Sequence, residues 1–253
     1  MDLYHYTDLN SLLSILKSNN DHPDTINLRA YSYLSMDDQV DCRYLVKQIA
    51  DIKKEKDPLF DSNNWANEMI DFGFYHFGKP YFVSFTSQDN TQYMLKGFKN
   101  GNKDIALVLS ESSDFYLDDP YRTTLPFKTL QCKYWDKQQI ENEFYCKYNG
   151  RFQTTDKEEA RELCYYACMI KDPKYAKENE VRLICFADDS IIVDDKTNGK
   201  TYINTYNNLA NLKKILVSSE RKAKLECIKR KIHACCPCFD INNVEVNVFI
   251  DNL

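Results

Sequence analysis

Helix-type and strand-type patterns follow one another irregularly in this sequence, and that order limits the fold more than any single motif does. Leucines of the first segment repeat on one helical face, whereas residues 181–217 contain four strand-type segments in succession. Asn198-Gly199, between two of these segments, is typical of a tight hairpin turn. Strand–helix–strand units do not recur at a steady spacing. We therefore expect an α+β fold in which mixed, mostly antiparallel sheets are flanked by helices.

The expected elements cover most of the chain. Helical periodicity or capping signals are found in residues 9–16, 37–54, 64–74, 89–98, 155–172 and 219–232. Strand-type composition or alternation is found in residues 3–6, 80–86, 105–109, 129–135, 181–186, 190–193, 200–206, 212–217 and 244–250. No repeat or linker divides the chain. We expect a single domain over residues 1–253, with a helix-rich part in 1–100 and a strand-rich part in 101–253.

Composition limits the classes of partner. The 18 Tyr and 14 Phe supply enough apolar surface for a large core. With 33 Lys and Arg against 38 Asp and Glu, the net charge of −5 gives no overall footprint for nucleic acid or anionic membrane, although a local basic groove stays compatible with it. No stretch is apolar enough for a membrane helix, and the first residues do not resemble a signal peptide. We expect a cytoplasmic protein with no membrane partner.

The ten cysteines show no repeating frame, so we expect most of them to be buried thiols. His233 with Cys235, Cys236 and Cys238 is the group that most suggests zinc. A second pair of ligands with suitable spacing is absent, and the cluster lies at an expected helix-to-strand junction. Buried thiols are the default interpretation here, and no metal is expected.

Two charge runs have an ordinary and a functional interpretation. Lys53-Lys54-Glu55-Lys56-Asp57 and Arg221-Lys222-Ala223-Lys224 are most simply solvated helix faces. A nucleic-acid contact is the alternative for the second run.

The common catalytic signatures, including phosphate-binding glycine loops and HExxH, are absent. Three other positions are more informative together than singly. His5 lies on the first expected strand, Tyr81 begins the strand over residues 80–86, and Glu180 opens the strand that continues through Arg182. Each also has a structural interpretation: a hydrogen-bonded histidine, a core tyrosine, and an edge carboxylate paired with a lysine.

Several short motifs occur in a familiar order. They are Leu3-Tyr4-His5-Tyr6-Thr7 followed by the leucine helix, Leu28-Arg29-Ala30, Met36-Asp37-Asp38, the strand Phe82 to Ser87, the segment Glu178 to Ile184, and the closing strands. Tyr93 occupies the position at which tryptophan is frequent in the family that these motifs resemble. In this order and spacing, nearly the whole chain resembles the bacterial family called domain of unknown function 2971. That family name implies no activity.

A more distant resemblance suggests an activity. His5, Tyr81 and Glu180 resemble the His-Tyr-Glu set of ADP-ribosyltransferases, and Phe77-Gly78-Lys79 with Tyr81-Phe82 is similar to the FGKGIYF segment of the poly(ADP-ribose) polymerase group. Pro80 replaces two residues of that segment, and Tyr93 falls one residue late. The first helix also resembles that of the DNA-modifying DarT-type transferases.

The resemblance implies an ADP-ribosyltransferase-like core and NAD as co-substrate. Glu180 would hold the ribose and offset the positive charge that develops as the nicotinamide bond breaks, as carboxylates do in glycoside cleavage. Tyr81 and Tyr93 would stack on nicotinamide, and His5, with Tyr6, Thr7, Ser87 and Arg182, would bind the dinucleotide. Arg182 is expected on the same strand face as Glu180, where it would orient the carboxylate. The acceptor would be an unknown macromolecule, either nucleic acid or protein, in a toxin or phage-defence context.

Two alternatives stay open. The chain is also interpreted as a non-catalytic nucleotide-binding, sensor or interaction module that keeps the fold without the reaction. The third interpretation is a metal-dependent nuclease-type toxin, in which acidic pairs bind magnesium: Asp37-Asp38, Asp118-Asp119 and Asp194-Asp195. The sequence does not predict the oligomeric state.

Overall fold

A computed structural model describes residues 2–17, 24–35, 41–87, 104–110, 115, 127–146, 157–187, 192–195 and 199–247. The strands are β1 (Asp2–Thr7), β2 (Thr25–Ser32), β3 (Lys79–Thr86), β4 (Ile105–Ser110), β5 (Lys128–Gln131), β6 (Lys133–Tyr134), β7 (Ile170–Lys171), β8 (Glu180–Ala187), β9 (Val193–Asp195), β10 (Lys200–Asn208), β11 (Leu212–Ser218) and β12 (Val244–Asn247). The α-helices are α1 (Leu9–Leu16), α2 (Tyr44–Lys56), α3 (Ser62–Phe77), α5 (Lys137–Ile140), α6 (Lys157–Met169) and α7 (Leu225–Cys235).

The sheet confirms the expected α+β class. Ten strands form one mixed, mostly antiparallel sheet in which β3 is central: β8 pairs with it along one edge, and β1 and β2 pair with different parts of its other edge. Strands β6 and β7 form a second, two-stranded parallel sheet. Strands from early and late parts of the chain are thus interleaved.

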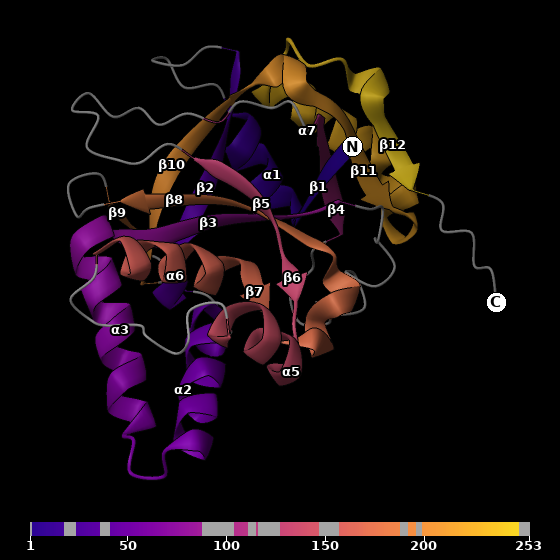
Figure 1. The fold of residues 1–253 in the computed structure, drawn as a ribbon. Helices are drawn as coiled ribbons and strands as arrows, with labels where there is room; N and C mark the ends of the chain where they lie inside the picture. The colour runs from indigo at the N-terminus through magenta and orange to yellow at the C-terminus, as the bar shows by residue number, and fades with distance from the viewer. Residues whose placement is uncertain are drawn as a thin grey trace, which may run out of the picture.

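Helices cover the two faces of the central strands. Helices α1 and α7 lie on one side of β3 and β8, while α2, α3 and α6 lie on the other (Figure 1). We call these the α1 face and the α6 face. The main core fills the α1 face and includes Leu3, Val83 and Leu183; Phe82, Ile184 and Phe186 pack on the α6 face. None of the helices in the described ranges is both long and apolar enough to span a bilayer.

Local patterns predicted many elements correctly. Helix α1 spans residues 9–16 as expected; Asp8 caps it by accepting hydrogen bonds from the backbone N–H groups of Asn10 and Ser11. The expected strands over residues 80–86 and 105–109 are β3 and β4. The hairpin at Gly199 is confirmed, because β9 and β10 pair antiparallel across it and Gly199 has a φ of +68°.

Other elements have boundaries that differ from the expected ones. The helix expected over 37–54 begins at Tyr44, after a 3-10 turn (Asp41–Arg43), and the helix expected over 219–232 begins with a 3-10 segment, η7 (Ser219–Lys224). The strand expected over 129–135 is interrupted at Cys132: β5 pairs with β8, whereas β6 pairs with β7. The helix expected over 89–98 lies outside the described residues.

Candidate functional site

The predicted site residues lie on three neighbouring strands. β1 carries His5, Tyr6 and Thr7, β3 carries Tyr81, and β8 carries Glu180 and Arg182. Because β1 and β8 flank β3 on opposite edges, these segments meet in one part of the sheet. Tyr93 lies outside the described residues.

Tyr81 and Glu180 are nevertheless separated. Tyr81 is 1% exposed within the core of the α1 face, whereas Glu180 lies on the α6 face with Arg182. Along β3, Tyr81 pairs with Cys185 and Thr86 pairs with Glu180. Tyr81 and Thr86 are five residues apart on β3, and at a rise of about 3.4 Å per residue this separation corresponds to roughly 17 Å along the strand. The structure therefore does not bring the predicted tyrosine and carboxylate into one cleft, because successive strand residues point to opposite faces.

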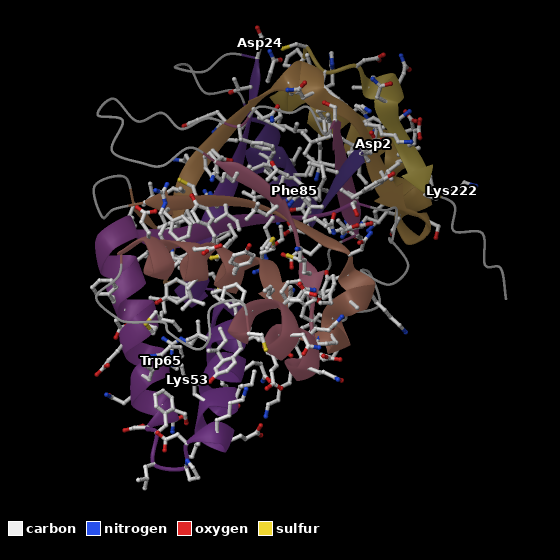
Figure 2. The ribbon with its side chains drawn as sticks, viewed as in Figure 1. Asp2, Asp24, Lys53, Trp65, Phe85 and Lys222 are labelled. Carbon is white, nitrogen blue, oxygen red and sulfur yellow. The ribbon has the colours of Figure 1, made fainter. Side chains whose placement is uncertain are left out.

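His5 lies on the α1 face and is partly exposed. Its Nδ1 donates to the Ser84 carbonyl oxygen at 3.0 Å, and its ring lies edge-on to Phe85 with centroids 5.7 Å apart. Phe85 lies in the middle of the molecule (Figure 2) and packs in turn against Phe115, with ring centroids 5.8 Å apart. The imidazole is thus held by the β3 backbone and an aromatic neighbour.

The other two β1 residues are buried on different faces. Tyr6 packs on the α6 face of the sheet with Ala106, Val108 and Leu216. Thr7 is also buried, and strand alternation puts its side chain on the face of His5. His5, Tyr6 and Thr7 are therefore not all presented to one ligand.

Ser87 closes the end of β3 onto the beginning of β8. Its backbone N–H donates to the Asn179 carbonyl oxygen at 3.2 Å, and Asn179 Nδ2 donates to the Ser87 hydroxyl at 2.7 Å. Gln131 Nε2 donates to Asn179 Oδ1 at 3.3 Å and to the Glu180 carbonyl oxygen at 3.0 Å. Asn179 has a φ of +44°, a left-handed conformation that asparagine tolerates better than most residues. These bonds fix the position at which Glu180 enters β8.

Glu180 is the centre of a buried ion-pair network. Arg182 Nε lies 3.0 Å from Glu180 Oε1, and Arg182 Nη2 lies 3.1 Å from Oε2. Lys171 Nζ lies 2.7 Å from Glu180 Oε2 and 2.7 Å from Glu178 Oε2. The Cys132 thiol also donates to Glu180 Oε2 at 3.8 Å. We call Lys171, Glu178, Glu180 and Arg182 the Glu180 network.

Three members of the network, Lys171, Glu180 and Arg182, are almost entirely removed from solvent. Arg182 is 0% and Glu180 5% exposed, and Arg182 Nη1 donates to the Cys168 carbonyl oxygen at the end of α6. Burial by itself raises the pKa of Glu180, but the charges of Arg182 and Lys171 outweigh it and lower the pKa from 4.5 to about 2. The Glu180 backbone N–H donates to the Tyr134 hydroxyl, whose pKa is raised chiefly by burial. Glu180 is therefore an enclosed carboxylate whose ionised form is favoured at neutral pH.

Sequence reasoning identified half of this network. The period of the strand predicted that Arg182 would share the face of Glu180, and the observed contacts confirm that the two side chains share a face and form an ion pair. The sequence did not indicate which lysine would pair with Glu180, so Lys171 was missed. The structural interpretation of Glu180 had nevertheless been a carboxylate paired with a lysine. The available signal was a lysine just before the Asp172-Pro173 turn, which brings the chain back toward Glu180.

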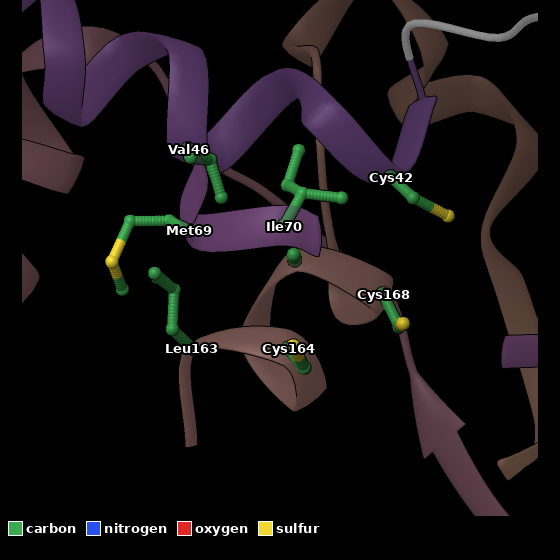
Figure 3. A pocket seen from close by; sticks show the side chains of 8 residues that line it. Cys42, Val46, Met69, Ile70, Leu163, Cys164 and Cys168 are labelled. Atoms are coloured by element: carbon green, nitrogen blue, oxygen red, sulfur yellow. The ribbon is translucent and has the colours of Figure 1, made fainter. Parts of the chain in front are cut away.

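A small apolar pocket lies between α2, α3 and α6. Three cysteines, Cys42, Cys164 and Cys168, line it together with aliphatic side chains and Met69 (Figure 3). Burial raises the pKa of the Cys164 thiol to about 12 and that of Cys168 well above its usual value. These thiols behave as packed apolar groups rather than as nucleophiles.

Metal ligands are not gathered in the described part of the chain: no three His, Cys, Asp or Glu side chains there are placed to hold an ion. Cys236 is buried, while His233 and Cys238 are exposed. Of the ten cysteines, six are buried as expected.

No family model matches the sequence, and no curated protein or solved structure matches the chain.

Proposed function

We propose that the protein is a non-catalytic interaction module whose Glu180 stabilises the fold. The observation that carries the proposal is the occupancy of the Glu180 carboxylate. A carboxylate offers about four lone-pair positions, and four donors already lie on its two oxygens: Arg182 Nε and Nη2, Lys171 Nζ and the Cys132 thiol. Three of these donors lie on Oε2 and one on Oε1, and Glu180 is 5% exposed, so a ribose hydroxyl could reach the carboxylate only if the surrounding side chains moved.

The surroundings of Tyr81 support the same conclusion. A ring that stacks on nicotinamide has to present a face to the ligand, whereas the Tyr81 side chain is packed in the main core. Exposure of this ring would require the removal of core side chains on the α1 face. The described positions of Tyr81 and Glu180 thus favour a structural role for both.

The transferase activity is the second candidate, and His5 is the residue that favours it. It is partly exposed on β1, on the same face as Tyr81, and its ring is held in place by Ser84 and Phe85. In this proposal His5 would bind the dinucleotide, and a carboxylate other than an enclosed Glu180 would be needed at the ribose. The magnesium-nuclease alternative has no such support: Asp37-Asp38 and Asp118-Asp119 lie outside the described residues, and Asp194-Asp195 form part of β9.

The deciding experiment measures nicotinamide release. The full chain is incubated with nicotinamide-labelled NAD, alone and with DNA, RNA or a protein mixture as acceptors. The proposal predicts release no faster than in samples without protein. Sustained release above that of samples without protein would overturn it, and a fall of at least tenfold in His5→Ala, with an unchanged melting temperature, would assign the activity to the transferase site with His5. His5→Ala is the decisive variant because its partly exposed side chain can be removed without disturbing the Glu180 network.

A further inference from the structure

A concentrated run of basic residues lies near the end of the chain. Residues 221–231 contain six Lys or Arg and one acid, Glu226, which gives the run a net charge of +5. The whole chain carries −5, so the remaining residues carry −10. An excess of positive charge is therefore concentrated in η7 and α7.

The fold turns this run outward. Ile228 and Ile232 on α7 are buried in the core of the α1 face, so the opposite side of the helix faces solvent. Arg221 is anchored by an ion pair with Asp104. Four basic side chains are exposed, and we call them the basic surface: Lys222, Lys224, Arg230 and Lys231. Lys222 lies at the margin of the molecule, away from the core (Figure 2).

Carboxylates do not neutralise this surface within the described residues. Neighbouring lysines on β11 have partners: Lys213 pairs with Asp2 at 2.6 Å, and Lys214 lies 3.7 Å from Glu245. By contrast, the four residues of the basic surface form no ion pair with any described carboxylate, and Arg230 Nε contacts only the Glu226 carbonyl oxygen, at 3.4 Å. The four charges are available to an anionic partner.

We propose that the basic surface binds the phosphate backbone of a nucleic acid. This inference rests on the interaction-module function above and names its class of partner. Closely spaced lysines and arginines that release condensed counterions from phosphates are the main source of sequence-independent nucleic-acid affinity. A membrane surface fits less well, because it also requires apolar side chains for insertion. The large hydrophobic residues exposed among the described positions, Leu34 and Leu59, lie outside η7 and α7.

The test is a salt titration of binding. Fluorescein-labelled 30-nucleotide single-stranded and duplex DNA are titrated with the full chain at 50, 100 and 200 mM salt, without NAD. Four phosphate contacts predict a slope of log affinity against log salt of about −3 to −4, or roughly a 100-fold loss over this range. The variant K222Q/K224Q/R230Q/K231Q should bind at least tenfold more weakly at 50 mM salt and with a much smaller slope.

Two control variants separate the surface from general charge effects. K47Q/K54Q/K56Q/K137Q removes the same number of charges from α2 and α5, far from α7 in Figure 1, and should keep its affinity within about threefold. K222R/K224R/R230K/K231R keeps every charge and should also bind like the natural sequence.

Salt-insensitive or absent binding, or an equal loss in the α2–α5 control, would overturn the proposal. Tighter binding to phosphatidylserine vesicles or to polyglutamate than to DNA would assign the surface to a membrane or an acidic protein and would also overturn it. Nicotinamide release from NAD would refute the non-catalytic function but leave this titration unchanged, so the two failures are distinguishable.

Discussion

Lys171 and Glu180 belong to different sheets, yet their Nζ and Oε2 atoms are 2.7 Å apart. β7, which ends at Lys171, pairs with β6, whereas β8, which begins at Glu180, lies in the ten-stranded sheet. Arg182 adds a bond to the end of α6, the helix that leads directly into β7. The Glu180 network therefore connects the small sheet, the large sheet and α6 through one enclosed carboxylate.

The lowered pKa of Glu180 predicts how stability depends on pH. In the unfolded chain the carboxyl titrates near 4.5, and in the folded protein near 2. Its stabilising contribution is complete above pH 4.5 and is lost as the pH falls toward 2, a change on the order of 3 kcal/mol. Urea unfolding midpoints from pH 7 to pH 2 should fall more steeply for the natural sequence than for Glu180→Gln. Parallel curves would show that Glu180 has an ordinary pKa in the folded protein.

Gly78, between α3 and β3, is required by its close approach to β8. Its φ is +83°, and a Cβ at this position would lie 2.7 Å from the Ala187 carbonyl oxygen on β8. Gly78→Ala should lower the free energy of unfolding by at least about 2 kcal/mol, since backbone strain and overlap with a paired strand add together. The matched control is Gly199→Ala, which has a similar φ but open space around the Cβ and should cost roughly 1 kcal/mol. Equal losses of stability would show that β8 moves aside.

Thiol reactivity should divide the cysteines by burial. Brief treatment of the native protein with iodoacetamide at pH 8, followed by peptide mass spectrometry, should label the exposed residues first: Cys146, Cys227 and Cys238. Cys164 and Cys168 should react only after unfolding, because both are buried with raised pKa values. Labelling of Cys168 in the native protein at the rate of Cys146 would contradict the packed pocket between α2, α3 and α6.

The sequence predicted what depends on local periodicity. The leucine stripe of α1, the hairpin at Gly199 and the shared face of Glu180 and Arg182 all follow from residues within a few positions of one another. The relation between Tyr81 and Glu180 does not, because it depends on the register of two strands about a hundred residues apart in the chain. Once Thr86 pairs with Glu180, alternation along β3 puts Tyr81 on the other face.

The Lys171–Glu180 contact also could not be predicted from local patterns, although the two residues are only nine positions apart in the sequence. Between them, η4 (Pro173–Glu178) forms a 3-10 segment that returns the chain to the carboxylate. Helical or strand periodicity gives no information on such a reversal, so the residue type was anticipated but its position was not.

The unfolding free energy of Glu180→Gln tests the structural role of this carboxylate most directly. Loss of its charge would remove the carboxylate that the buried Arg182 and Lys171 share and would leave Lys171 with Glu178, which predicts a destabilisation of roughly 3–5 kcal/mol in urea at pH 7. Glu178→Gln is the matched control: its side chain is 27% exposed, and it should cost less than about 1 kcal/mol. An unfolding curve for Glu180→Gln that coincides with that of the natural sequence would contradict the account, because a carboxylate kept for catalysis can be replaced without loss of stability.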